Sequence, residues 1–222
     1  FYLTEEIEDS RYMMSEAEES LASELSLSGP MAWNKLQGTV TSQLTVDFER
    51  DGKIEVVEFF HYGCGHCAAL EPRLESWARS LPPDVRLTRI PTNYRLMGID
   101  APQVFYTLQA LGQLDKLHAK VFDAAHKENK TLGNTKVLEG WLKEQGVDPV
   151  KYQEVAKSFS MSSRYGRAVQ LQNQFKIESV PTLVVGGKYI IKNAEGTLNV
   201  ADYLIAQLRR EAAAAAPAAA PA

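Results

Sequence analysis

The two cysteines of the chain, Cys64 and Cys67, are separated by two residues and follow an apolar run. Residues 54–60 are strand-like in composition and a helical pattern begins after a short turn, so Cys64 is expected to open a helix. Unpaired N–H groups and the positive end of the helix dipole at that position stabilise a thiolate relative to a thiol. Because Cys67 lies one turn further along, a disulfide can close between them. The pair predicts thiol–disulfide chemistry.

His66 lies between the cysteines and can donate a hydrogen bond or a positive charge to the Cys64 sulfur, which lowers its pKa further. A zinc site is one alternative, with His61 and His66 as additional ligands. However, His66 lies inside the four-residue loop, and no second Cys or His pair follows at finger spacing. A purely structural disulfide is the other alternative, but so short a loop removes little unfolded-chain entropy. Redox chemistry without a metal or cofactor is therefore favoured.

The composition is that of a chain able to build one sizeable core, since 45% of its 222 residues are hydrophobic. The net charge of −4 does not indicate a nucleic-acid surface. No apolar run approaches the roughly 18 residues needed to span a bilayer. Residues 1–35 form an acidic extension, in which either a helix from Glu5 to Leu25 or a mobile arm is expected.

A β-α-β unit surrounds the cysteines. Apolar residues from Leu70 to Leu81 follow helical spacing, and residues 85–90 alternate as a second strand does. Its two strands should be parallel. Residues 44–48 also alternate, which predicts a hairpin or an outer first strand.

Helical patterns fill residues 99–175, with helix starts expected at Ala101, Asn134 and Asp148 and a final helix over 161–174. Their apolar stripes are interpreted as bundle core. Four further side chains, in this region or just before it, are interpreted as surface or packing residues: Tyr94, Tyr106, His118 and His126.

Strand character returns over residues 177–185, and Gly186-Gly187 then predicts a tight turn into residues 188–191. A last helix is expected from Asn199. Residues 212–222 contain only Ala and Pro and are expected to form an exposed tail.

This arrangement resembles the thioredoxin fold, and the helical insertion is similar to that of the DsbA family of bacterial thiol:disulfide interchange proteins. The resembling segments span roughly residues 43–210 and are Glu55–Phe60, Cys64-Gly65-His66-Cys67, Val180-Pro181-Thr182 and Val185–Tyr189. The predicted fold class is α/β: a thioredoxin fold with a helical domain inserted between the β-α-β unit and a C-terminal β-hairpin and helix. The predicted divisions are 1–35, the two thioredoxin-like parts 36–98 and 176–211, the inserted helical domain 99–175, and the tail 212–222.

The resemblance implies a role for each site residue. Cys64 would be the exposed nucleophile, Cys67 its buried partner, and Pro181 a cis proline packed against the disulfide. Val180 would present its backbone to a bound peptide. Glu58 would be a buried acid that relays a proton to or from Cys67; the alternative, a surface charge on an edge strand, fits its apolar neighbours less well.

The resemblance further implies a monomeric periplasmic enzyme that donates its disulfide to folding secreted proteins with free cysteines. A quinone-linked membrane oxidase would restore that disulfide. The dipeptide Gly65-His66 is that of protein disulfide isomerases, so an isomerase remains an alternative. A thioredoxin-like reductase and a non-enzymatic partner-binding or zinc-binding module are the others.

Overall fold

The computed structural model describes residues 40–42, 52–192 and 196–215, and within them a five-stranded sheet has the order β1-β5-β4-β2-β3. The strands are β1 (Val40–Ser42), β2 (Ile54–Phe60), β3 (Val85–Pro91), β4 (Thr182–Val185) and β5 (Tyr189–Lys192). The helices are α3 (Gly65–Ser80), the 3₁₀ turn η1 (Leu96–Gly98), α4 (Ala101–Ala110), α5 (Leu114–His126), α6 (Thr135–Glu144), α7 (Pro149–Ala156), α8 (Phe159–Gln174) and α9 (Thr197–Ala215).

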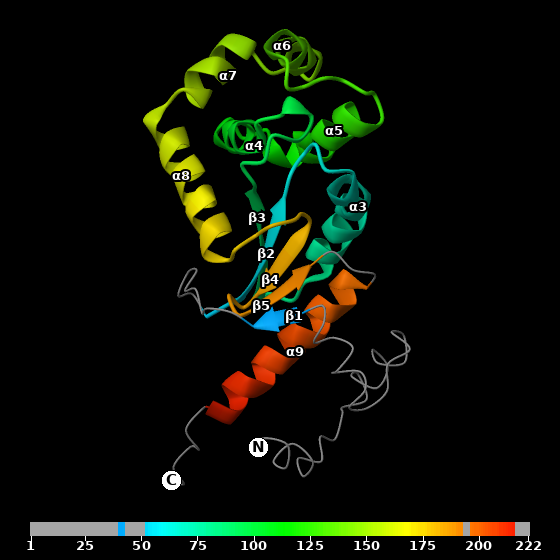
Figure 1. The fold of residues 1–222 in the computed structure, drawn as a ribbon, viewed down its shortest axis with the longest axis vertical. Helices are drawn as coiled ribbons and strands as arrows, with labels where there is room; N and C mark the ends of the chain where they lie inside the picture. The colour runs from blue at the N-terminus through cyan, green and yellow to red at the C-terminus, as the bar shows by residue number, and fades with distance from the viewer. Residues whose placement is uncertain (1–39, 43–51, 193–195, 216–222) are drawn as a thin grey trace.

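Strands β2 and β3 pair in parallel, with α3 connecting them, so the predicted β-α-β unit is confirmed. Strand β4 pairs antiparallel with β2 and forms the predicted hairpin with β5. Helices α4 to α8 lie between β3 and β4 in the chain; α4 to α7 gather at one end of the sheet, and α8 runs beside the strands (Figure 1). The predicted fold class is confirmed.

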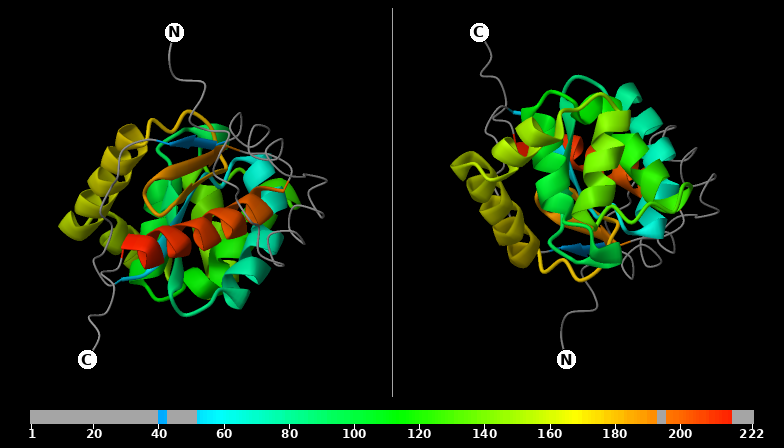
Figure 2. Two further views of the ribbon diagram at one scale, coloured as in Figure 1. Left: turned by 90° about the horizontal axis from the view of Figure 1, so that it is seen from below. Right: turned by 90° about the horizontal axis from the view of Figure 1, so that it is seen from above.

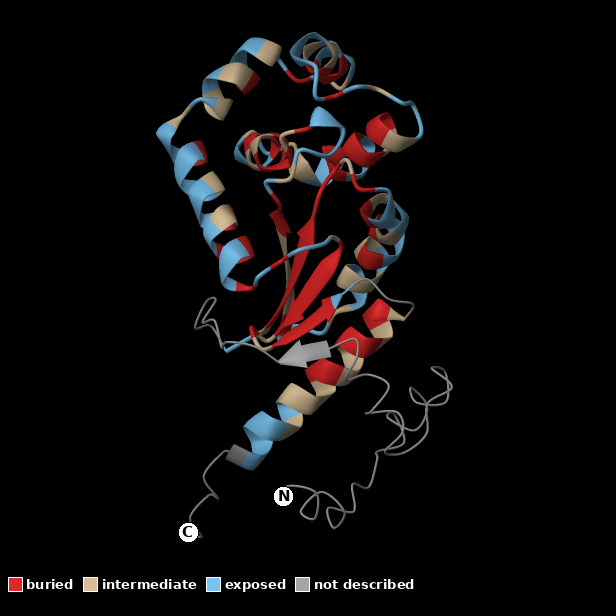
Figure 3. Ribbon diagram, viewed as in Figure 1, coloured by how far each residue is buried: buried red, intermediate tan, exposed pale blue. Residues whose placement is uncertain are grey.

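Alternation along β2 sends its side chains to both faces of the sheet. Val57 and Phe59 pack with the α8 residues Ala168 and Leu171 on one face. Val56 packs on the opposite face, where α3 and α9 supply the covering side chains. Seen from below, α9 crosses in front of the strands and α8 stands at one side (Figure 2). Strand β2 is buried along nearly its whole length (Figure 3).

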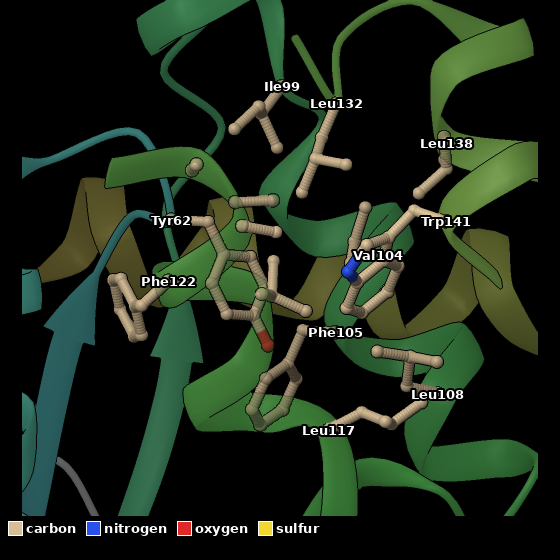
Figure 4. Packing of buried hydrophobic residues seen from close by; sticks show 14 of the residues in the cluster. Tyr62, Ile99, Val104, Phe105, Leu108, Leu117, Phe122, Leu132, Leu138 and Trp141 are labelled. Carbon is tan, nitrogen blue, oxygen red and sulfur yellow. The ribbon is translucent and has the colours of Figure 1, made fainter. Parts of the chain in front are cut away.

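A third cluster fills the space between the sheet end and the helical insertion. The Tyr62 ring enters it from the loop after β2 and lies among Phe105 and Phe122 of α4 and α5 (Figure 4). Cys64 and Cys67 belong to the same cluster. The cysteine loop is therefore packed directly against the insertion.

Three expectations differ from the structure or lie outside it. The strand predicted from residue 177 begins only at Thr182. Ile177 is buried against α8 from a loop, and its apolar side chain fits the alternating pattern of a strand without belonging to one. The predicted tail from residue 212 is helical as far as Ala215, since alanine readily extends α9. The acidic extension 1–35, the strand at 44–48 and residues 216–222 lie outside the described residues; the described strand at the β5 edge of the sheet is β1.

Candidate active site

Cys64 is the N-cap residue of α3, as predicted. Its sulfur accepts a hydrogen bond from the main-chain N–H of Cys67 at 3.4 Å. A hydrogen bond from the Cys67 thiol is the main cause that lowers the Cys64 pKa to about 6, and main-chain N–H groups of Cys67 and His66 add to it. Both cysteines are free thiols, and Cys64 is only 7% exposed, so the expectation of an exposed nucleophile is wrong for this structure. Cys64 is thus prepared as a thiolate at neutral pH.

Cys67 lies in the opposite electrostatic environment. Its side chain is fully buried, and this burial, reinforced by the neighbouring Cys64 sulfur, raises its pKa far above that of an ordinary thiol. The two cysteines therefore differ in reactivity: one is a ready anion and the other a thiol that keeps its proton.

His66 is exposed on the first turn of α3. It lowers the Cys64 pKa in two ways, through its main-chain N–H and through the charge of its imidazole. The role of His66 in catalysis stays a prediction.

Val180 and Pro181 lie opposite the cysteines. The Val180–Pro181 peptide bond is cis, as the family resemblance implied. The Cys64 sulfur lies 3.4 Å from the Val180 carbonyl oxygen, to which it donates a hydrogen bond in its protonated form. The loop before β4 therefore approaches the sulfur through its main chain.

Glu58 is fully buried on β2, which lies between β4 and β3, so the alternative of an exposed charge on an edge strand is wrong. Burial, and next the Glu71 carboxylate, raise the pKa of Glu58 to about 8 against the opposing effect of Arg89. Arg89 Nε lies 3.4 Å from Glu58 Oε2. Within the described part of the chain, neither Glu58 carboxyl oxygen has a hydrogen-bond partner.

Residues that the sequence analysis did not select complete a buried charge cluster around Glu58. Arg89 is its parallel-register partner on β3 and bridges to Glu71 on α3 at 3.2 Å. His118 of α5 places Nε2 3.4 Å from Glu71 and Nδ1 2.8 Å from the Tyr62 hydroxyl. The parallel pairing of the two predicted strands could have indicated that Arg89 lies beside Glu58. His118, interpreted as a packing or surface residue, is buried and packs against the rings of Phe60 and Phe122, and it also reaches Glu71 on the cysteine helix.

The turn η1 forms an exposed apolar edge beside the cysteine loop. Leu96 and Met97 are 38% and 47% exposed. A Cβ added to Gly63 would lie 2.5 Å from the Leu96 carbonyl oxygen, so the residue before Cys64 touches this turn directly. No sequence pattern indicated this proximity.

Two absences concern only the described residues. Within residues 40–42, 52–192 and 196–215, no three His, Cys, Asp or Glu side chains are grouped as metal ligands would be. No helix in the same residues has the length and apolar character of a membrane span.

Comparison with known proteins finds the family model described as a DSBA-like thioredoxin domain over residues 91–204. The chain is 43% identical over 165 residues to the thiol:disulfide interchange protein DsbA of Bordetella parapertussis, which covers 72% of this chain and 78% of the relative. The corresponding protein of Pseudomonas aeruginosa is 38% identical over 172 residues, 75% of this chain and 82% of that protein. The crystal structure of Pseudomonas aeruginosa DsbA superposes with a TM-score of 0.72 at 36% identity, covering 79% of this chain and 95% of that one.

Proposed function

Since this chain belongs to the DsbA family of thiol:disulfide interchange proteins and is a thiol:disulfide oxidoreductase, we propose that Cys64 and Cys67 form the disulfide that it donates to substrate proteins. The observation that carries the proposal is the unequal acidity of the two cysteines. An acidic thiol is a good leaving group and keeps the reduced protein stable, so such a disulfide is oxidising.

The transfer proceeds in two exchanges. A substrate thiolate attacks the Cys64 sulfur, the bond to Cys67 breaks, and Cys67 leaves with the electron pair. A second substrate thiolate then attacks the substrate sulfur of the mixed disulfide, and Cys64 leaves as a thiolate. Two substrate thiols are thereby oxidised to one disulfide while the disulfide of the enzyme is reduced to a dithiol.

Glu58 supplies the proton that Cys67 needs when it leaves. With a pKa of about 8 the Glu58 carboxyl group is protonated at neutral pH, and a general acid works best with a pKa near the working pH. The buried Cys67 sulfur is neutralised by this proton, which avoids leaving an anion without solvent.

Val180 and Pro181 form the substrate-binding loop of the proposal. The Val180 main chain lies beside the Cys64 sulfur, where an extended peptide with a cysteine opposite Cys64 could pair with it. Family resemblance supports the remaining assignments: folding secreted proteins as substrates, reoxidation by a quinone-linked membrane oxidase, a monomeric state and a periplasmic location.

Disulfide isomerisation is the second candidate activity, and the Gly65-His66 dipeptide favours it. Gly65 is exposed, and a Cβ added there would contact nothing within 4 Å. The reduced enzyme would use the same Cys64 thiolate to attack wrong disulfides in substrates.

The test is equilibration of the protein with glutathione buffers of graded ratio, together with oxidation of a reduced two-cysteine peptide. We expect a disulfide that is reduced more readily than that of glutathione and a Cys64→Ser variant without activity. A dithiol that becomes oxidised even in strongly reducing buffer would contradict disulfide donation and support a reductase. Recovery of activity from scrambled ribonuclease by the reduced protein separates an isomerase from both.

A further inference from the structure

His61, three residues before Cys64, contacts both cysteines through its main chain. Its carbonyl accepts a hydrogen bond from the Cys64 N–H at 2.9 Å. A main-chain hydrogen bond of His61 also acts on the Cys67 sulfur, whose pKa it lowers against the larger effect of burial. The His61 backbone is therefore part of the framework that holds the dithiol.

The His61 side chain is fully buried and makes two hydrogen bonds of its own. The Gly63 N–H donates to Nδ1 at 2.9 Å, so Nδ1 carries a lone pair and the proton belongs to Nε2. Nε2 lies 2.6 Å from the Tyr94 carbonyl, to which it donates. The ring thus joins the cysteine loop to a residue 33 positions away in one defined tautomer.

The segment held by His61 ends in the apolar turn η1. Tyr94 is anchored at its other end, because its hydroxyl donates to the Ile177 carbonyl at 2.7 Å. From the far side the turn meets the insertion: a Cβ added to Gly133 would lie 2.6 Å from the Gly98 carbonyl carbon and 2.9 Å from the Met97 oxygen. The turn is therefore enclosed between Gly63 and Gly133, with its side chains outward.

We propose that His61 is a positioning residue that holds Leu96 and Met97 at a fixed place beside Cys64, as a docking edge for apolar segments of substrate proteins. The proposal rests on the proposed function, since it concerns substrates of the same dithiol. Exposed large hydrophobic side chains beside a reactive sulfur fit an unfolded chain, which presents apolar side chains near its cysteines. Small thiols would react at Cys64 without using this edge.

The surroundings of His61 keep it neutral, as the two hydrogen bonds require. Burial lowers the His61 pKa, although the main chains of Tyr94 and Ile99 favour the charged form. The charged groups that face it are Asp100 and Arg95, which oppose each other and pair at 3.1 Å. Protonation of Nδ1 would remove the acceptor for the Gly63 N–H.

The experiment compares His61→Phe with the wild type on three substrates: a reduced peptide with leucines flanking its two cysteines, the same peptide with serines instead, and glutathione. The phenylalanine fills the space of the imidazole but makes neither hydrogen bond. For the leucine peptide we expect KM to rise about tenfold with kcat unchanged, the size of one lost apolar contact. The losses with the serine peptide and with glutathione should be at least about threefold smaller, because neither substrate presents apolar side chains to this edge. His61→Gln, whose amide both donates and accepts, should recover part of the loss.

A second variant displaces the turn η1 from the side of the helical insertion. It tests the proposal even if His61→Phe does not fold. Gly133→Ala should raise KM for the leucine peptide in the same way, because its new Cβ must displace Gly98. Gly140→Ala is the matched control, since a Cβ there meets nothing within 4 Å. Urea midpoints establish that each variant is folded.

Equal losses with glutathione and the leucine peptide would place the role of His61 at the dithiol and overturn the proposal. Unchanged kinetics in both His61→Phe and Gly133→Ala would also overturn it. Nitrogen NMR of the histidine rings gives an independent test, because a His61 proton on Nδ1 contradicts the hydrogen bonds described. If the protein does not donate its disulfide, the wild type oxidises none of the three substrates. That result differs from every outcome described for the His61 and Gly133 variants.

Discussion

Reduction of the Cys64–Cys67 disulfide should make the stability of this protein depend on pH in a way that the oxidised form does not share. Only the reduced form contains a Cys64 thiolate, and only the folded state stabilises it, through α3 and Cys67. Because the folded pKa is depressed, this stabilisation is complete above the unfolded pKa and is lost as pH falls through the folded one.

The magnitude follows from the two pKa values. A change from about 8.5 in the unfolded chain to about 6 in the folded protein corresponds to roughly 3 kcal/mol at high pH. The Cys64 sulfur lies beside the exposed Gly65 and His66, so screening by water reduces this to about 2 kcal/mol. Against it, closing a four-residue loop stabilises the oxidised form by roughly 2 kcal/mol in the chain-entropy model.

The two effects are similar in size, so the sign of the difference should reverse with pH. The oxidised form should be the more stable at pH 5.5, and the reduced form should overtake or equal it between about pH 7 and 8.5. Above about pH 8.5 the reduced form gains no further stability relative to the oxidised form. Cys67 has a raised pKa and keeps its proton in the folded state, whereas its thiol ionises in the unfolded chain, and this difference favours unfolding. Glu58 is present in both redox forms, so its contribution largely cancels from the difference.

Urea unfolding of both forms at pH 5.5, 7.0 and 8.5 measures this difference directly. His66→Gln should flatten its pH dependence in part, since the charge of His66 contributes to the low Cys64 pKa. A difference between reduced and oxidised protein that stays constant over these pH values would refute the argument, because it would mean that the folded state does not favour the Cys64 thiolate.

Further predictions concern the proposed steps of transfer. Cys67→Ala should accumulate mixed disulfides on non-reducing gels when its Cys64 thiolate attacks substrate disulfides, because Cys67 can no longer attack the Cys64 sulfur and release the bound substrate; absence of adducts would count against these roles. Glu58→Gln should slow exchange at neutral pH and stabilise the fold by roughly 2–4 kcal/mol at pH 7, since an acid with a folded pKa of about 8 is destabilising once the unfolded group ionises. An unchanged exchange rate would exclude Glu58 as the proton donor. Removing residues 1–30 should leave dithiol oxidation nearly unchanged, as they contain no cysteine; a large loss would assign them a working role.

Much of the fold followed from local patterns. The alternation of residues 54–60, the helix opened by Cys64 and the Gly186-Gly187 turn each depend on neighbours a few positions apart, so sequence spacing was sufficient to predict them. Ile177 marks the limit of such patterns: its burial comes from packing against α8, which alternation cannot distinguish from a place in a strand.

The sequence by itself determined the reactive pair and the identity of its neighbour, His66, because helix capping and a Cys-x-x-Cys spacing are local properties. Only the tertiary structure decided that Glu58 is on an inner strand beside Arg89, that His118 reaches Glu71, and that His61 holds the turn beside Cys64. These contacts join residues that are tens of positions apart on different elements. Burial and charge depend on every element packed around a group, so pKa values and docking edges arise only when the sheet and the insertion have come together.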